Sequence, residues 1–139
     1  MVHDDTSAIV DQLAGSASFS RCDRSDIQAL VAAGKQTPFP AHWAFVQEGT
    51  PADACYVLLS GTVKVFYGRQ EVAVLGIGDI IGEGALVEGG QRTATVTSVE
   101  HGSALRVEYD ALRALLADRP HLRETMVAVW RSRRPHPAG

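Results

Sequence analysis

The sequence has only two cysteines, and neither lies in a metal-binding or redox motif. Cys22 and Cys55 stand 33 positions apart, outside any Cys-x-x-Cys pair or Cys/His cluster. At this chain length the pattern predicts two free, buried thiols rather than a disulfide framework. The five histidines are scattered along the chain: His3, His42, His101, His121 and His136. They form no His-x-His or HExxH pair, and no Ser-His-Asp arrangement stands out, so we expect neither a metal site nor an enzyme.

Long apolar runs are also missing. No stretch approaches the roughly 20 apolar residues that a membrane-spanning helix needs, and Met1 to Ser7 carries His and Asp in place of Lys and Arg. We therefore expect no membrane span and no secretory signal, with the cytoplasm as the location. No repeat or linker divides the 139 residues, a length that suits one domain with its own core.

Positive charge is not in excess. The net charge is −3, so no overall basic field attracts nucleic acid. Nine residues follow Trp130, too few for a recognition helix, and we expect no DNA contact by this chain. Arg131, Arg133 and Arg134 could attract an acidic partner, but cations suit a helix C-terminus and we expect a solvated helix end. The preference for Arg over Lys suggests a bacterial, GC-rich genome.

Apolar spacing predicts helices at both ends of the chain. Residues 8–13 form a short apolar-spaced segment near the N-terminus. Ser25 and Gln28 have the spacing of a capping box, and Gly34 is placed to end that helix in the C′ role. Towards the C-terminus, two apolar faces with helical spacing flank Pro120. Their members are Tyr109, Leu112, Leu115 and Leu116, then Leu122, Met126, Val129 and Trp130.

Between these helices the pattern changes to short strands. Pro38 and Pro40 break any helix, and glycines recur every ten residues or so. The expected strands are 43–46, 55–60, 63–67, 72–75, 80–81, 93–99 and 104–107. Residues 55–60 form a nearly continuous apolar run, which is typical of a buried strand. The chain is therefore predicted to be mainly β with flanking helices, as a β-sandwich or roll.

The most informative stretch has the chemistry of an anion site. Gly82 follows a strand and lets a ligand approach the backbone. The residues after it, 83–86, are long enough for about one helical turn, whose free N–H groups suit an anion. Arg92 can hold a phosphate through two parallel hydrogen bonds. Glu83 beside such an anion needs a donor of its own, and a sugar hydroxyl is the obvious one. Together these residues describe a ribose phosphate.

This stretch resembles the phosphate-binding cassette of cyclic-nucleotide-binding domains, as in catabolite-activator-type regulators, kinase regulatory subunits and cyclic-nucleotide-gated channels. The family pattern is Gly-Glu-x-Ala/Gly-Leu, a loop, and Arg-Ser/Thr/Ala-Ala. Gly82-Glu83-Gly84-Ala85-Leu86 and Arg92-Thr93-Ala94 fill every place of it. The likeness runs from about Ser18 to Trp130. It implies a jelly-roll β-roll with N-terminal helices and two C-terminal helices.

The resemblance also implies roles for the residues of the motif. Glu83 would accept the ribose 2′-OH and Arg92 would pair with the cyclic phosphate. The backbone N–H groups of Gly84 and Ala85 would donate to the phosphate, as would Thr93. The implied ligand is cAMP or cGMP, bound without any other cofactor. In the family, a Thr at the place of Thr93 is often found in cGMP-binding sites, where its hydroxyl can meet the guanine 2-amino group. Thr93 could also serve simply as a strand residue.

The resemblance sets the expected domain plan and partners. Residues 1–17 would form an N-terminal helical segment, 18–130 the cyclic-nucleotide-binding domain and 131–139 a disordered tail. A sensor of this kind needs a protein effector, and a homodimer is possible. Two other functions stay open: a degenerate roll that binds proteins but no nucleotide, and an enzyme on a cupin-like roll. Glu83 and Arg92 argue against the first, unless they form a mere surface salt bridge. Missing metal ligands argue against the second.

Overall fold

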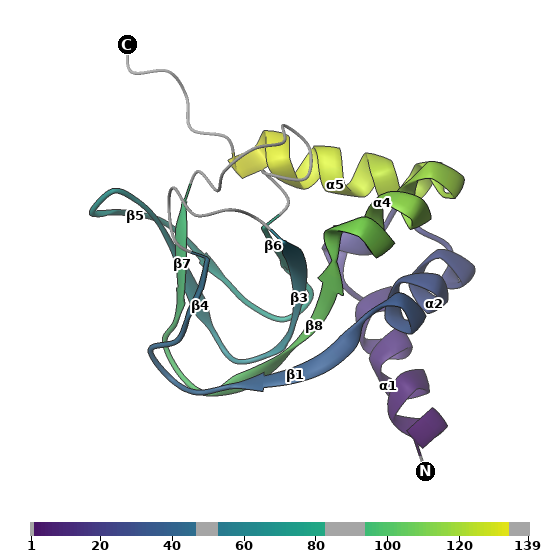
Figure 1. The fold of residues 1–139 in the computed structure, drawn as a ribbon, viewed down its shortest axis with the longest axis horizontal. Coiled ribbons are helices and arrows are strands. Elements are labelled where there is room, and N and C mark those ends of the chain that lie inside the picture. The colour runs from purple at the N-terminus through teal and green to yellow at the C-terminus, as the bar shows by residue number, and fades with distance from the viewer. Residues whose placement is uncertain (1, 47–52, 83–93, 134–139) are drawn as a thin grey trace.

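Two antiparallel sheets form the centre of the molecule in the computed structural model, which describes residues 2–46, 53–82 and 94–133 (Figure 1). Among these residues, one four-stranded sheet has the order β1-β8-β3-β6 and the other the order β2-β7-β4-β5. The strands are β1 (Lys35–Phe39), β2 (Ala44–Val46), β3 (Ala54–Ser60), β4 (Val63–Tyr67), β5 (Gln70–Leu75), β6 (Ile80–Ile81), β7 (Thr95–Ser98) and β8 (Gly102–Glu108). The expected mainly β class is confirmed.

Helices cover one face of the first sheet, and Figure 1 shows α1, α2 and α4 gathered beside β8. The helices are α1 (Val2–Ala14), the 3-10 helix η1 (Ala17–Phe19), α2 (Arg24–Ala33), α4 (Tyr109–Asp118) and α5 (Pro120–Arg133). Val10 and Leu13 of α1 belong to the same buried core as the first sheet. The N-terminal helix therefore packs on the roll itself. No helix in the described ranges is long and apolar enough to cross a membrane.

Strand β3 is buried on both faces, which explains its apolar run. Cys55, Val57 and Leu59 belong to the core under the helices. Leu58 belongs to a second core, between the two sheets, and Tyr56 packs against that core. Successive side chains of a strand point to opposite faces, so a strand between two cores must be apolar at nearly every position. The predicted buried strand is confirmed.

The N-terminus of α2 corrects our capping assignment. The N-cap is Asp23, not Ser25: its carboxylate accepts from the Asp26 N–H at 3.0 Å. Asp26 in turn accepts from the Asp23 N–H at 3.2 Å, which completes the capping box. Two aspartates three positions apart meet the same geometric requirement as Ser25 with Gln28. Gly34 is the C-cap in extended conformation, with φ −108°, rather than a C′ residue.

Strand β1 was missed because its sequence contains Pro38. Proline has no N–H for a ladder, so it argues against a central strand. Here β1 lies at the edge of its sheet and pairs only with β8 among the described strands, Pro38 opposite Ser103. The expected strands 63–67 and 80–81 match β4 and β6 at both ends, and the boundaries of the other described strands differ from the expected ones by at most two residues.

The last helix extends beyond the expected end of the domain. We placed residues 131–133 in a disordered tail, but they continue α5 to Arg133. Arg131 favours this end of a helix because a cation complements the partial negative charge of its last carbonyls. The rest of that segment, 134–139, and the side chain of Trp130 lie outside the described residues.

Both cysteines are free, as predicted. Cys55 is buried in β3, whereas Cys22 is only half-buried. The Cys22 Sγ lies 3.4 Å from the Thr125 Oγ1 of α5. Burial raises the pKa of the Cys22 thiol, although the contact with Thr125 opposes the shift. The thiol therefore stays protonated at neutral pH.

The core between the sheets makes a direct prediction about stability. Leu58 is fully buried there. Leu58→Ala removes buried methyl groups and leaves a cavity, so we expect a loss of about 2–5 kcal/mol in the free energy of unfolding, measured by urea denaturation. Val99→Ala is the control, because Val99 is 42% exposed, and it should change the value by less than about 0.5 kcal/mol. Equal values for the two variants would contradict a closely packed roll.

Candidate functional site

The predicted cassette begins in one sheet and ends at the other. Gly82 follows β6, and Ala94 precedes β7. β6 belongs to the sheet that contains β3, while β7 pairs with β2 and β4 of the second sheet. Of the predicted site residues, the structure describes Gly82 alone. The others lie outside the described residues: Glu83, Gly84, Ala85, Arg92 and Thr93.

A tight turn fixes the approach to this site. The Asp79 carboxylate accepts from the Gly76 N–H at 2.9 Å, and the Asp79 N–H donates to the Gly76 carbonyl at 3.0 Å. The turn is tied to β3, because Leu58 donates to the Asp79 carbonyl at 2.9 Å and accepts from the Gly78 N–H at 2.7 Å. It is also tied to the N-terminal segment, since the Ser18 hydroxyl donates to Asp79 at 3.4 Å. The strand that leads into the cassette is therefore held from two sides.

Gly78 must be a glycine for two reasons. Its φ is +87°, a conformation that side chains disfavour. A Cβ at this position would also lie 2.7 Å from the Cβ of Ser16, closer than real carbon atoms approach. Gly82 has φ +90° as well. Both glycines therefore shape the backbone on either side of β6.

Tyr109 connects this backbone to the helices. Its hydroxyl donates to the Gly82 carbonyl, 27 residues earlier in the sequence. Its backbone N–H donates to the Asp53 carbonyl at 3.0 Å, just before β3. Tyr109 is the first residue of α4 and is buried. The start of α4 is thus hydrogen-bonded to the first residue of the predicted cassette.

Tyr109 was not predicted as a site residue, because from the sequence its side chain was assigned only to an apolar helix face. The useful signal would have been its place at a strand-to-helix junction, immediately after Glu108. A buried tyrosine hydroxyl normally finds a hydrogen-bond partner. Sequence alone does not reveal which carbonyl it meets.

An arginine and a tyrosine lie side by side on the inner face of the first sheet. Arg106 of β8 is the register partner of Tyr56 of β3. The Arg106 guanidinium lies 3.2 Å from the Glu108 carboxylate and 3.6 Å from the Asp53 carboxylate. Hydrogen bonding to the Tyr56 hydroxyl raises the pKa of Arg106, so the guanidinium stays charged. Arg106 was not predicted as a functional residue. The signal for it in the sequence was a charged side chain between the apolar Leu105 and Val107, both of which are buried in the structure.

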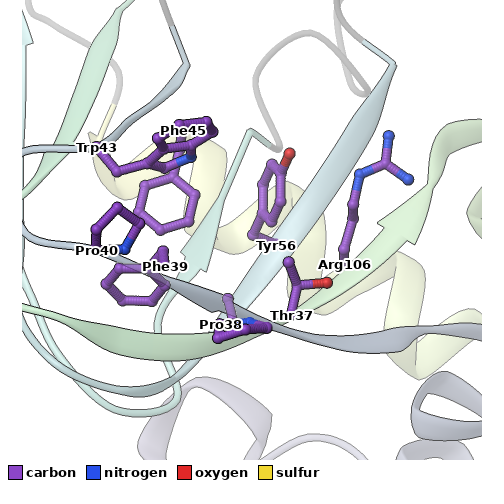
Figure 2. Close-up of a pocket in the computed structure, with 9 residues that line it drawn as sticks. Thr37, Pro38, Phe39, Pro40, Trp43, Phe45, Tyr56 and Arg106 are labelled. Carbon is purple, nitrogen blue, oxygen red and sulfur yellow. The ribbon is translucent and has the colours of Figure 1, made fainter.

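These residues border an aromatic hollow of about 270 Å³ (Figure 2). It lies where β1 and β2, each at the edge of its sheet, follow one another. Its lining comprises Thr37, Pro38, Phe39, Pro40, Trp43, Phe45, Tyr56, Ala104 and Arg106. Figure 2 shows the rings of Phe39, Phe45 and Trp43 close together at one end, with Arg106 at the other. None of these residues belongs to the predicted cassette.

One group of potential metal ligands exists in the described part of the chain. The ligand atoms of Asp23, Asp26 and His121 lie within 4.8 Å of one another. Both carboxylates already cap α2, and Arg119 donates to Asp26 at 3.1 Å. The hydrogen bond from Ser25 is the main cause that lowers the pKa of Asp23. This group is therefore explained as a helix cap with an ion pair, and it supports no metal site.

Comparison with known proteins identifies relatives over most of the chain. A regulator from Mycobacterium tuberculosis, described as a "CRP-like cAMP-activated global transcriptional regulator", is 32% identical over 122 residues, which is 84% of this chain and 54% of the relative. A "cGMP-dependent protein kinase" from Toxoplasma gondii is 35% identical over 77 residues, 55% of this chain and 8% of the kinase. The chain thus spans about half the length of the bacterial regulator.

The fold has a similar relative among solved structures, the catabolite activator protein of Thermus thermophilus. The TM-score is 0.73 at 24% identity, over 85% of this chain and 58% of that one. The family model described as "Cyclic nucleotide-binding domain" matches residues 36–119, more than half of the chain. The matched region contains the strands, the predicted cassette and α4, and on this evidence the chain belongs to the cyclic nucleotide-binding domain family.

Proposed function

We propose that this chain is a sensor or regulatory domain that binds cAMP, with cGMP as the second candidate, and performs no reaction of its own. The cassette motif carries the proposal: every position of it is filled, and its first and last residues, Gly82 and Ala94, lie next to strands of different sheets of the roll. The relatives support the same ligand class, because one is named as cAMP-activated and another as cGMP-dependent.

Each cassette residue has a proposed role. Arg92 pairs with the cyclic phosphate through two hydrogen bonds, a geometry that lysine lacks. Glu83 accepts the ribose 2′-OH. The N–H groups of Gly84 and Ala85 donate to the phosphate, and Gly82 allows the backbone to come close. Burial of the phosphate makes Arg92 the principal anchor, since an unpaired charge in such a site is costly.

The choice between adenine and guanine rests on fewer observations than the assignment of a cyclic nucleotide. The Thr93 hydroxyl can donate to the phosphate, or it can accept from the 2-amino group of guanine, which adenine lacks. One hydrogen bond is worth about 0.5–1.5 kcal/mol, at most about tenfold in affinity. The longer match is with the regulator named as cAMP-activated. We therefore place cAMP ahead of cGMP.

The proposal includes a coupling between the ligand and the C-terminal helices. A ligand shifts a helix arrangement only if it prefers one arrangement by a few kcal/mol. Tyr109 supports such a preference: the hydroxyl on α4 bonds the Gly82 carbonyl, next to Glu83. A displacement of the cassette backbone would change that bond and with it the position of α4 and α5.

The setting of this sensor is also a proposal. Two free thiols suit a reducing compartment, so we propose the cytoplasm. Output would pass to a protein effector, and we propose no direct contact between this chain and DNA, because its net charge is −3. This chain spans about half of the bacterial regulator, so that relative does not identify the effector of this chain.

Replacement of Arg92 tests the ligand assignment. Arg92→Ala leaves the buried phosphate without its cation, which should cost about 2–5 kcal/mol in binding, or at least about thirtyfold in affinity. The measurement is competition of cAMP against a fluorescent cyclic-nucleotide analogue. Arg69→Ala is the matched control, because Arg69 is exposed on the turn between β4 and β5. The unfolding midpoint should stay the same in both variants, and equal affinity in both would refute the role of Arg92.

Replacement of Tyr109 tests the coupling. Tyr109→Phe removes only the hydroxyl that bonds Gly82, so cAMP affinity should fall by about fivefold, the worth of one hydrogen bond. Hydrogen exchange of the α4 and α5 amides should respond to saturating cAMP in the wild type and respond less in the variant. Tyr67→Phe on β4 controls for the loss of a tyrosine hydroxyl elsewhere. An undiminished response of the helices in Tyr109→Phe would show that the signal takes another route.

A further inference from the structure

Arg106 is a charged residue in an apolar stretch of β8. Its neighbours Leu105 and Val107 belong to the core under the helices. Arg106 points to the opposite, inner face of the sheet, where Tyr56 of β3 is its register partner, and Figure 2 shows the two side chains side by side. The Arg106 side chain is only 31% exposed. Withdrawing a charge from water is unfavourable unless the charge is well paired, so the partners of this guanidinium indicate its role.

Three groups from two strands surround the guanidinium of Arg106. It donates to the Glu108 carboxylate at 3.2 Å and lies 3.6 Å from the Asp53 carboxylate. The Tyr56 hydroxyl is a further hydrogen-bond partner. Glu108 is the last residue of β8, and Asp53 immediately precedes β3. A planar guanidinium presents its N–H donors in a fixed fork, so one side chain can hold these groups together. Arg106 therefore ties the end of β8 to the start of β3.

The start of β3 in turn holds the first residue of α4. The Tyr109 N–H donates to the Asp53 carbonyl at 3.0 Å. Glu108 is the N-cap of α4, but its side chain forms no capping bond to this helix, whose residues are all described. A capping side chain commonly satisfies one of the first N–H groups of a helix, whereas the Glu108 carboxylate is bound to Arg106. The position of Tyr109 therefore depends on Asp53, and Arg106 holds Asp53.

Tyr109 carries this connection to the cassette. Its side chain is buried, and its hydroxyl donates to the carbonyl of Gly82. A buried ring has little freedom to adjust, so its hydroxyl meets the Gly82 carbonyl only when the Tyr109 backbone is correctly placed. The path from Arg106 to Gly82 thus runs through Asp53 and Tyr109, and each step of it is a contact in the structure.

We propose that Arg106 is a positioning residue for the nucleotide site: it holds the start of β3 to the end of β8, so that the Tyr109 hydroxyl reaches Gly82. The effect on the ligand rests on the proposed function, whereas the placement of Tyr109 does not. Each ion pair alone would contribute little, because the side chains of Asp53 and Glu108 are 74% and 70% exposed. A network that shares one guanidinium contributes more than isolated surface pairs do.

Exchange of the Tyr109 amide in the nucleotide-free chain tests the placement of this residue. Arg106→Ala releases Asp53, so the Tyr109 amide should exchange with solvent at least about fivefold faster, because local opening becomes easier. Arg24→Ala is the matched control: Arg24 also pairs with a carboxylate of another helix, Asp11 at 2.6 Å, and its side chain is 51% exposed. This control should leave the Tyr109 amide unchanged. Unchanged exchange in Arg106→Ala would overturn the proposal.

A double-mutant cycle tests the effect on the ligand. The affinity for cAMP is measured in Arg106→Ala, in Tyr109→Phe and in the double variant, by competition against a fluorescent analogue. Arg106→Ala should lower the affinity by about two- to fivefold, no more than the loss of one hydrogen bond. In the Tyr109→Phe background it should add less than about twofold, because the path is already broken. No loss in the wild-type background, or the same loss in both backgrounds, would overturn the proposal.

The conservative variant Arg106→Lys separates the fork from the charge. Lysine keeps the charge but is a point donor, so this variant should resemble Arg106→Ala in both measurements. Full recovery of wild-type behaviour would show that charge alone suffices and would overturn the proposal. Circular dichroism checks that the variants are folded, and Arg106→Lys carries the test if Arg106→Ala is not. A wild type that binds no cyclic nucleotide would refute the proposed function instead, and exchange of the Tyr109 amide would still decide whether Arg106 places Tyr109.

Discussion

Strand β3 must bury both of its faces, and the arrangement of the whole molecule follows from that constraint. One face supports the core under the helices, and the other supports the core between the sheets. Tyr56 of this strand is the register partner of Ile81 on one side and of Arg106 on the other. The strand that leads into the cassette and the strand that leads into α4 therefore flank the same residue. The hydrogen bond from Tyr109 to Gly82 connects the residues that directly follow these two strands.

A second polar link ties the N-terminal helices to the C-terminal ones. The Asp26 carboxylate is buried, and Arg119 and His121 approach it at 3.1 and 3.6 Å. Removing the partner of a buried charge is strongly destabilising, of the order of 3–5 kcal/mol. These contacts hold the start of α5 beside α2, so under the proposed coupling the ligand would displace the later turns of α5 rather than its start. Such a hinge would convert a small change at the cassette into a displacement of the helix end.

The parts of the fold that sequence predicts are those fixed by local pattern. The apolar run of β3 and the helical faces before and after Pro120 both show their period directly. The cassette was identified as a motif of neighbouring residues. By contrast, β1 was missed because proline is tolerated only at an edge, and edge position depends on the assembled sheet. Tyr109 was missed because its partner Gly82 lies 27 residues away. Hydrogen bonds between residues so far apart in the sequence form only once the tertiary fold brings those residues together.

The central claim, that the roll holds a 3′,5′-cyclic nucleotide, is tested most directly by calorimetric titration of the unmodified chain with cAMP, cGMP and 5′-AMP. The account predicts one site per chain for both cyclic nucleotides, with cAMP bound more tightly than cGMP. It predicts much weaker binding of 5′-AMP, because the ring that the cassette encloses is open. Absence of heat with both cyclic nucleotides, or equal affinity for cAMP and 5′-AMP, would contradict the account.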